Sequence, residues 1–262
     1  MNRLADIRFL GEYRDFSSMR PVAVAEALHA AYEEAFTKQD FNRAGHLIAS
    51  LHLELVSAWE ATGALLIAVS KASRCRSILS SFLSYKQGEV GHFFKGLMES
   101  EDWFGYVGLP SAETLNKLVG DDAGPEKLKD SDLKKLLFPM VDMYLKDGVV
   151  QAYNKLKHGN VMIRDRFAIS DDPELSHKRA GDSLFLVMND HSLVSIRVST
   201  SKARELAAIY LNNIRENQKR TAAILEWVIF CLRERAALGK GSNTTPQDDL
   251  RRGLSRSPAD GD

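Results

Sequence analysis

The chain has 262 residues and is 44% hydrophobic, which is enough for one large core or two modest domains. Its 35 Lys and Arg residues balance its 35 Asp and Glu residues, so no overall field draws it onto nucleic acid or a membrane surface. Cys75 and Cys231 lack the spacing of a redox or metal motif and indicate a reducing compartment. The apolar stretches Ala61–Val69 and Ala222–Leu232 are too short to span a bilayer, and the charged N-terminus does not suit a signal peptide. We therefore expect a soluble cytoplasmic protein with no membrane partner.

The first hundred residues predict three helices. Residues 20–37 have apolar side chains near a 3.6-residue period, with Pro21 in the first turn. Asp40 is a suitable N-cap for a longer helix that reaches about Ala72. A third helical stretch covers about 75–100, although three glycines weaken it.

The middle of the chain begins with a turn and continues as helices. Residues 103–110 are rich in aromatic residues and glycine, which predicts a packed turn, and residues 111–113 open a short helix. Residues 121–125 read as a loop. Ser131 is a suitable cap for the next helix, and Pro139 kinks or restarts it. The continuation from Met140 is predicted to reach His158 and to end at a glycine.

After residue 160 the pattern changes to that of strands. Ser183–Met188 and Leu193–Ser199 predict two strands of a hairpin within an insertion at about 161–199. A long helix from about Lys202 to Leu238 follows; at 1.5 Å per residue it would be about 55 Å long. Residues 239–262 are predicted to be a disordered tail. The fold class expected is an all-α bundle of six or seven helices in a single domain, residues 1–238, with a small β-hairpin insertion before the last helix.

The densest group of polar side chains lies at the end of the helix predicted for 140–158. A step of 100° per residue places four polar residues on one narrow stripe: Asp147, Gln151, Asn154 and His158. The opposite side is apolar and includes Tyr153. This stripe should therefore face solvent, a partner or a cleft.

The chemistry of this helix end suits an RNA phosphodiester. His158 titrates near neutral pH and is suited to act as general base and then acid, while Asn154 would orient the attacking group. Four cations would hold the phosphates: Lys155, Lys157, Arg164 and Arg166. A purely structural explanation also exists, because cations in a last turn stabilise the helix macrodipole.

The segment Tyr153-Asn154-Lys155-Leu156-Lys157-His158 resembles the signature of the HEPN superfamily (higher eukaryotes and prokaryotes nucleotide-binding). The resemblance implies a compact helical domain of the kind found in bacterial toxins and phage-defence proteins. In that family an Arg, often followed by Asn and then by a His, forms a metal-independent ribonuclease site between two protomers. Asn154 and His158 match the Asn and His, whereas Tyr153 stands where the family has its Arg.

Two functions follow from these observations. The first is an HEPN-like RNA- or nucleotide-binding protein, with metal-independent cleavage through Asn154 and His158 as one form of that activity. The second is a non-enzymatic helical adaptor that acts through protein–protein contacts along its long helix. In either case we expect a homodimer, because the motif face and the long helix lack a covering element.

No metal or cofactor is expected. Two Glu-x-x-His spacings, Glu89 with His92 and Glu174 with His177, occur without the further inward-facing carboxylates that a di-metal bundle needs. They are interpreted as surface residues at chance spacing.

Overall fold

The computed structural model describes residues 3–72, 77–86, 88–110, 130–146, 149–157, 162–164, 183–187, 193–197 and 200–241. Within these residues the chain is mainly helical, which confirms the expected all-α class. Nine α-helices and one 3-10 helix lie in this described part, more than the six or seven expected.

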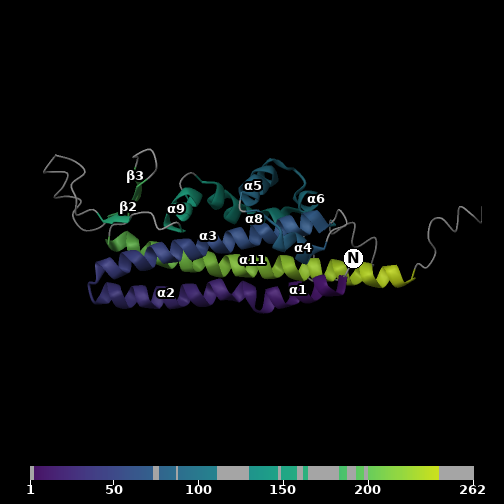
Figure 1. The fold of residues 1–262 in the computed structure, drawn as a ribbon, viewed down its shortest axis with the longest axis horizontal. Helices are drawn as coiled ribbons and strands as arrows, with labels where there is room; N and C mark the ends of the chain where they lie inside the picture. Colours follow the sequence, from purple (N-terminus) through teal and green to yellow (C-terminus); the bar gives the residue numbers. More distant parts are fainter. Residues whose placement is uncertain are drawn as a thin grey trace, which may run out of the picture.

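One layer of the fold consists of long helices that run side by side (Figure 1). Helix α1 (Arg3–Asp15), the 3-10 helix η1 (Ser17–Met19) and α2 (Arg20–Thr37) follow one another along one side. Helices α3 (Phe41–Ala72) and α11 (Thr200–Gly241) complete the layer. As predicted, Asp40 caps α3: its Oδ1 accepts the backbone N–H of Arg43 at 3.1 Å.

Shorter helices form a second layer on α3 (Figure 1). They are α4 (Ile78–Leu83), α5 (Glu89–Glu99), α6 (Trp103–Val107), α8 (Asp130–Leu145) and α9 (Val149–Lys157). The helix predicted for 75–100 is thus two helices. The turn predicted for 103–110 is largely a helix, since Asp102 caps its start and Gly108, at φ 76°, ends it.

Helix α1 was not anticipated from the sequence. It is held by the buried carboxylate of Asp6, which accepts the hydroxyl of Ser77 at 2.7 Å and the backbone N–H of Leu79 at 3.1 Å. These two groups belong to the start of α4, whose free N–H groups attract negative charge. A side chain of α1 therefore caps a helix more than seventy residues away in the chain.

Three short strands are described between α9 and α11. β1 (Met162–Arg164), β2 (Ser183–Val187) and β3 (Leu193–Arg197) pair antiparallel in that order, with Phe185 opposite both Ile163 and Ser195. The turn at 188–192 and the rest of the predicted insertion lie outside the described residues, so the hairpin insertion as a whole stays a prediction. The same holds for the short helix at 111–113, the loop at 121–125 and the tail beyond residue 241.

The core lies around the second half of α3. Trp59, Leu65 and Leu66 are at most 2% exposed, and residues 64–69 are buried on every side of the helix. By length and composition Arg43–Ala72 passes as a membrane-spanning helix, yet 72% of its most apolar window is buried inside the fold. A helix that is hydrophobic all round is the central helix expected of a layered bundle.

Helix α5 packs closely against α3 at Gly63. A Cβ atom at this position would lie 2.5 Å from Cγ1 of Val90 and 2.9 Å from Cζ of Phe94, both buried side chains of α5. Gly91, also within a helix, has nothing within 4 Å of such an atom. Of these two glycines, Gly63 is the one that packing requires.

We predict opposite effects for the same substitution at these two glycines. Gly63→Ala should lower the free energy of unfolding by about 1–3 kcal/mol, because the added methyl group overpacks the α3–α5 contact. Gly91→Ala should raise it by about 0.5–1 kcal/mol through better helix propensity. Urea unfolding followed by circular dichroism measures both, and a similar change in the two variants would contradict the close approach.

Candidate functional site

The predicted site lies at the end of α9, but it is not carried by one continuous helix. α8 ends at Leu145, and a turn in which the N–H of Val149 bonds to the carbonyl of Lys146 at 3.3 Å separates it from α9. The helix predicted for 140–158 is therefore wrong, while α8 does continue through Pro139. Asp147 lies outside the described residues, so the stripe in the described part is reduced to Gln151 and Asn154.

Helix α9 has one buried apolar face and one exposed polar face, as the helical projection predicted. Ala152 and Tyr153 are buried, Gln151 and Lys157 are exposed, and Asn154 is partly exposed. The ammonium of Lys157 lies 5.4 Å from the centroid of the Tyr153 ring, within the range of a cation–π contact. The described part of the predicted site thus consists of an amide and a cation on the outer side of α9.

The other predicted site residues lie outside the described part, either entirely or in their side chains. Lys155 lies in α9 and Arg164 in β1, but their side chains are outside the described part, as are His158 and Arg166 entirely. Their convergence with Asn154 and Lys157 stays a prediction.

Sequence reasoning missed the group that anchors α9. Glu60 of α3 is only 7% exposed and lies against the short helices. It accepts a hydrogen bond from the hydroxyl of Tyr144 at 3.3 Å, and Tyr153 of α9 also contacts it. Glu60 is a single charge within the apolar run 58–69, and such an isolated charge is the one sequence signal of this group.

Burial and Glu60 together keep the surrounding tyrosines protonated. The pKa of Tyr153 is raised to about 12, first by burial and then by the charge and hydrogen bonding of Glu60; a hydrogen bond with Ser57 opposes the rise. The pKa of Tyr144 is raised for the same two reasons, and that of Tyr85 by burial and then by Glu60. Neutral hydroxyl groups are therefore available as donors to the buried carboxylate.

A second buried contact fixes the start of α9. Nε2 of His52 lies 3.3 Å from the backbone carbonyl oxygen of Val149. Because a carbonyl only accepts, this nitrogen carries the hydrogen. Burial lowers the pKa of His52, which favours the neutral ring. His52 and Glu60, both on α3, thus hold the start and the middle of α9.

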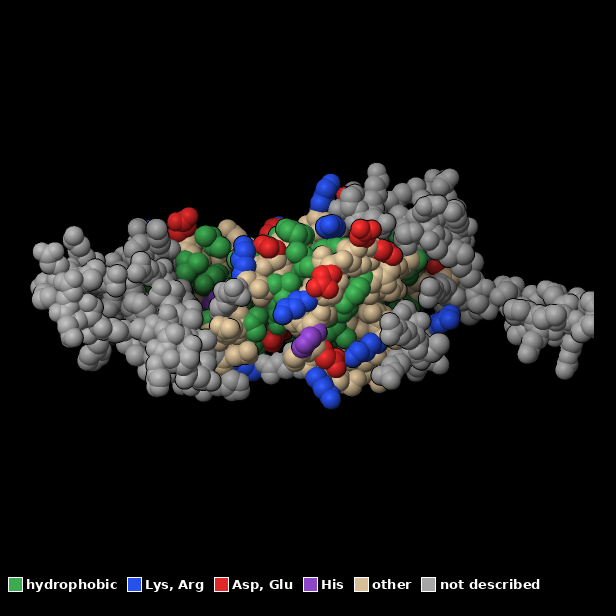
Figure 2. Space-filling model, turned by 90° about the horizontal axis from the view of Figure 1, so that it is seen from above, with side chains coloured by type: hydrophobic (Ala, Val, Ile, Leu, Met, Phe, Trp, Pro, Cys, Tyr) green, Lys and Arg blue, Asp and Glu red, His purple; other side chains and the backbone are tan. Residues whose placement is uncertain are grey.

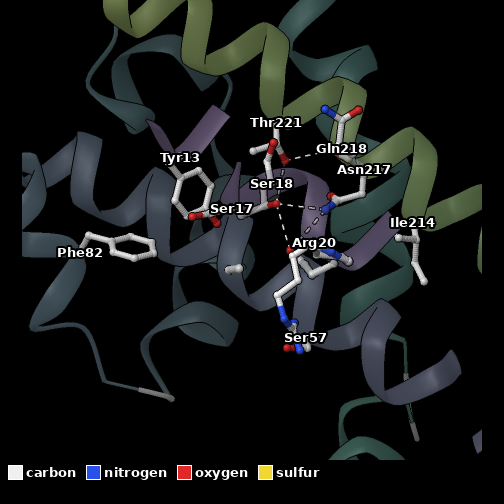
Figure 3. A pocket seen from close by; sticks show the side chains of 14 residues that line it. Tyr13, Ser17, Ser18, Arg20, Ser57, Phe82, Ile214, Asn217, Gln218 and Thr221 are labelled. Carbon is white, nitrogen blue, oxygen red and sulfur yellow. Dashed lines mark hydrogen bonds between the residues drawn. The ribbon is translucent and has the colours of Figure 1, made fainter. Parts of the chain in front are cut away.

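A cavity of about 200 Å³ lies on another side of α3, at the bend between α1 and α2 (Figure 3). Its floor is made of buried residues of α3 and α11, and its rim includes the exposed Ser17 and Arg20. Figure 3 shows Asn217 and Thr221 of α11 beside Ser18 of the bend. Ser57 lines the cavity and also contacts Tyr153, so the cavity adjoins the anchor of α9.

A buried hydrogen-bond network crosses the cavity floor. Nδ2 of Asn217 donates to the carbonyl of Ala58 at 3.3 Å and to Oγ1 of Thr62 at 3.1 Å. The hydroxyls of Thr62 and Thr221 lie 2.9 Å apart, and that of Thr221 bonds to the carbonyl of Asn217 at 2.8 Å. The network joins the middle of α3 to the middle of α11.

In the described part of the chain, no group of three or more His, Cys, Asp and Glu residues is placed to hold a metal ion. Glu89 pairs with Lys71 at 2.8 Å, and Nδ1 of His92 lies 2.9 Å from the carbonyl of Gly88. The first Glu-x-x-His pair is therefore engaged in other contacts, and the second lies outside the described residues.

No family model, curated protein or solved structure matches the chain.

We predict that Glu60→Gln lowers the pKa values of Tyr153 and Tyr144, because the variant removes the nearby negative charge. The near-ultraviolet absorbance of tyrosinate reports the titration, and Tyr153→Phe identifies the contribution of that residue. Glu12→Gln, at an exposed position of α1, is the matched control and should change nothing.

The raised pKa has a consequence for stability. The folded value of Tyr153, about 12, lies above the ordinary value of 10.0. The contribution of Tyr153 to the free energy of unfolding is therefore complete below pH 10.0 and is lost as the pH rises toward about 12.

The Glu60→Gln variant also has an outcome that would contradict the assignment. An unchanged tyrosinate titration in that variant would show that Glu60 does not act on these tyrosines.

Proposed function

We propose that this is an HEPN-like helical protein that binds RNA or a nucleotide through the outer side of α9 and does not cleave it. The observation that carries the proposal is the division of α9 into two faces. Tyr153, where the family has its Arg, is 5% exposed and contacts Glu60, while Asn154 and Lys157 face outward. The helix offers an amide and a cation but no guanidinium at the motif position.

Cleavage is disfavoured because position 153 belongs to the core. A residue packed against the buried Glu60 cannot also reach a phosphodiester on the outer side of the helix. Lys157 supplies a point charge in place of the planar clamp that arginine forms on phosphate. Asn154 and His158 would then position the ligand, and the catalytic roles expected for them would not be used.

The electrostatics favour a local and salt-sensitive interaction. Acidic and basic side chains are interspersed over the face of the short helices (Figure 2), and the whole chain has a formal net charge of zero. The C-terminal end of the α9 macrodipole is negative, and the charge of Lys157 partly balances it. Less of the Lys157 charge is therefore left to attract phosphate. In this proposal the surplus of positive charge comes from Lys155, Arg164 and Arg166.

A non-enzymatic adaptor is the second candidate, favoured by a different observation. Three large apolar side chains near the α1–α2 bend and at the end of α4 are exposed: Phe16 by 80%, Leu83 by 74% and Met19 by 46%. Exposed apolar groups of this size are common at protein interfaces.

The homodimer, a bacterial toxin or phage-defence role and the cytoplasmic location remain parts of the proposal.

We predict that the purified chain shifts the fluorescence anisotropy of a labelled single-stranded RNA at low salt. Lys157→Glu should weaken binding about three- to tenfold and reduce the salt dependence by roughly one phosphate contact. Lys219→Glu makes the same charge change on α11, where Lys219 pairs with Glu216 at 2.8 Å, and should retain most of the binding.

The same reactions, run with excess EDTA and resolved on a gel, test the absence of cleavage. RNA degradation by the wild type that His158→Ala abolishes would contradict a binding-only role and establish a metal-independent ribonuclease. Intact RNA together with no anisotropy change at low salt would reject RNA binding and favour the adaptor.

A further inference from the structure

Helix α9 depends on its docking against the long helices. It has only nine residues and lies on α3 beside the end of α8 (Figure 1). An isolated helix shorter than about 12 residues is marginal in water, so α9 is not stable by itself. Its buried side chains are those of Ala152 and Tyr153, while His52 contacts its start and Glu60 its middle. A change in the charge of either polar contact therefore acts directly on the attachment of α9.

The ring of His52 has one nitrogen that is hydrogen-bonded and one that is not. Nε2 donates to the carbonyl oxygen of Val149 at 3.3 Å, so Nδ1 is the unprotonated nitrogen of the neutral ring. Nδ1 has no hydrogen-bond partner among the described residues, and the side chain is only 5% exposed. A proton on Nδ1 would create a buried cation with an unsatisfied donor, which strongly disfavours the docked arrangement.

The described groups of the neighbouring helices do not compensate for such a cation. From α11, the ring centroid of Tyr210 lies 5.6 Å from that of His52, and burial raises the pKa of Tyr210 to about 12, so its hydroxyl stays neutral. On α9 the described charged side chain is that of Lys157, at the opposite end of the helix. At the end of α8, Asp142 pairs with Lys146 at 3.2 Å.

The acidic groups of the long helices have other partners. Glu54 of α3 pairs with Arg20 of α2 at 3.1 Å, and Glu33 of α2 pairs with Arg204 of α11 at 2.6 Å. Glu60 lies about 12 Å further along α3 and is engaged by tyrosines. In the described part of the chain, no carboxylate forms an ion pair with His52. Burial therefore lowers the pKa of His52, and the hydrogen bond to the carbonyl of Val149 opposes this only in part.

We propose that His52 is a pH-sensitive switch for the docking of α9, and that protonation of its ring at Nδ1 releases the start of α9 from α3. The proton binds to the open form, because Nδ1 is buried in the docked form. Acid therefore shifts the equilibrium toward the open form by mass action. Asn154 and Lys157 lie on the same short helix, so its release displaces the outward side of α9 as well. The inference concerns docking alone and does not depend on RNA or nucleotide binding.

The sign of the pH dependence follows from the direction of the shift. The ordinary pKa of the ring is 6.5, and burial lowers the pKa of the docked form below this value. The contribution of His52 to docking is therefore complete above pH 6.5 and is lost as the pH falls below it. The opening equilibrium should rise by up to about tenfold for each pH unit, until the pH reaches the pKa of the docked form.

Hydrogen exchange of the full chain, followed by mass spectrometry, tests this switch. Protection factors are corrected for the intrinsic exchange rate at about pH 7.5 and about pH 5. Between these values, protection of the α9 peptides in the wild type should fall by about three- to thirtyfold, and protection of the α2 peptides should not. His52→Gln keeps a donor for the carbonyl of Val149 but cannot become charged, so α9 should stay protected. His46→Gln, at an exposed position of the same helix, should behave as the wild type.

Several outcomes would overturn the switch. These are an unchanged protection of α9 in the wild type, an equal loss in His52→Gln, or an equal loss in α2. If His52→Gln does not fold, as judged by its thermal melt, the wild type still gives an answer. Deuterium exchange at the ring carbon between the two histidine nitrogens, resolved by tandem mass spectrometry, measures the pKa of His52 directly. A value below 6.5 is expected, and a value of 6.5 or above would reject the proposal because protonation would then favour the docked form.

Discussion

The structure depends on one constraint: the second half of α3 is buried on all sides. Residues 64–69 leave no face for solvent, so helices must cover α3 from both directions. α11 and the α1–α2 path cover one side, and the short helices cover the other (Figure 1). Gly63 shows how tight this arrangement is, because α5 approaches α3 where a methyl group has no room. The two-layer architecture is thus a consequence of a single apolar segment.

Polar residues within such a helix require partners, and the partners mark both candidate sites. Glu60 faces the short helices, where Tyr144 and Tyr153 supply hydroxyl groups. Thr62 faces α11, where Asn217 and Thr221 complete a buried network. An uncompensated charge or hydroxyl at either position would cost several kcal/mol or more. The interior of α3 therefore fixes where α9 docks and how the floor of the cavity is built.

The sequence predicted what periodicity and caps encode. The bounds of α2 and the start of α3 followed from Pro21 and Asp40, and the inward direction of Tyr153 followed from the helical projection. It did not predict α1, which is held by Asp6 at a distant helix start, because that contact exists only after folding. The break between α8 and α9 was missed because the apolar pattern continues across it. The partners of Glu60 come from α8 and α9, and the cavity is lined by residues of α1, α2, α3, α4 and α11, so no local pattern specifies either arrangement.

The two candidate sites share one residue, and this has a physical meaning. Ser57 lines the cavity and contacts Tyr153, whose backbone positions Asn154 one residue later on α9. A ligand that engaged the hydroxyl of Ser57 would compete with Tyr153 for the same group. Tyr153 would keep its contact with Glu60, so α9 would stay docked while its anchor lost one of two partners. The hydroxyl of Ser57 therefore links the cavity wall to the anchor of α9, and one neutral hydrogen bond of this kind contributes only about 0.5–1.5 kcal/mol.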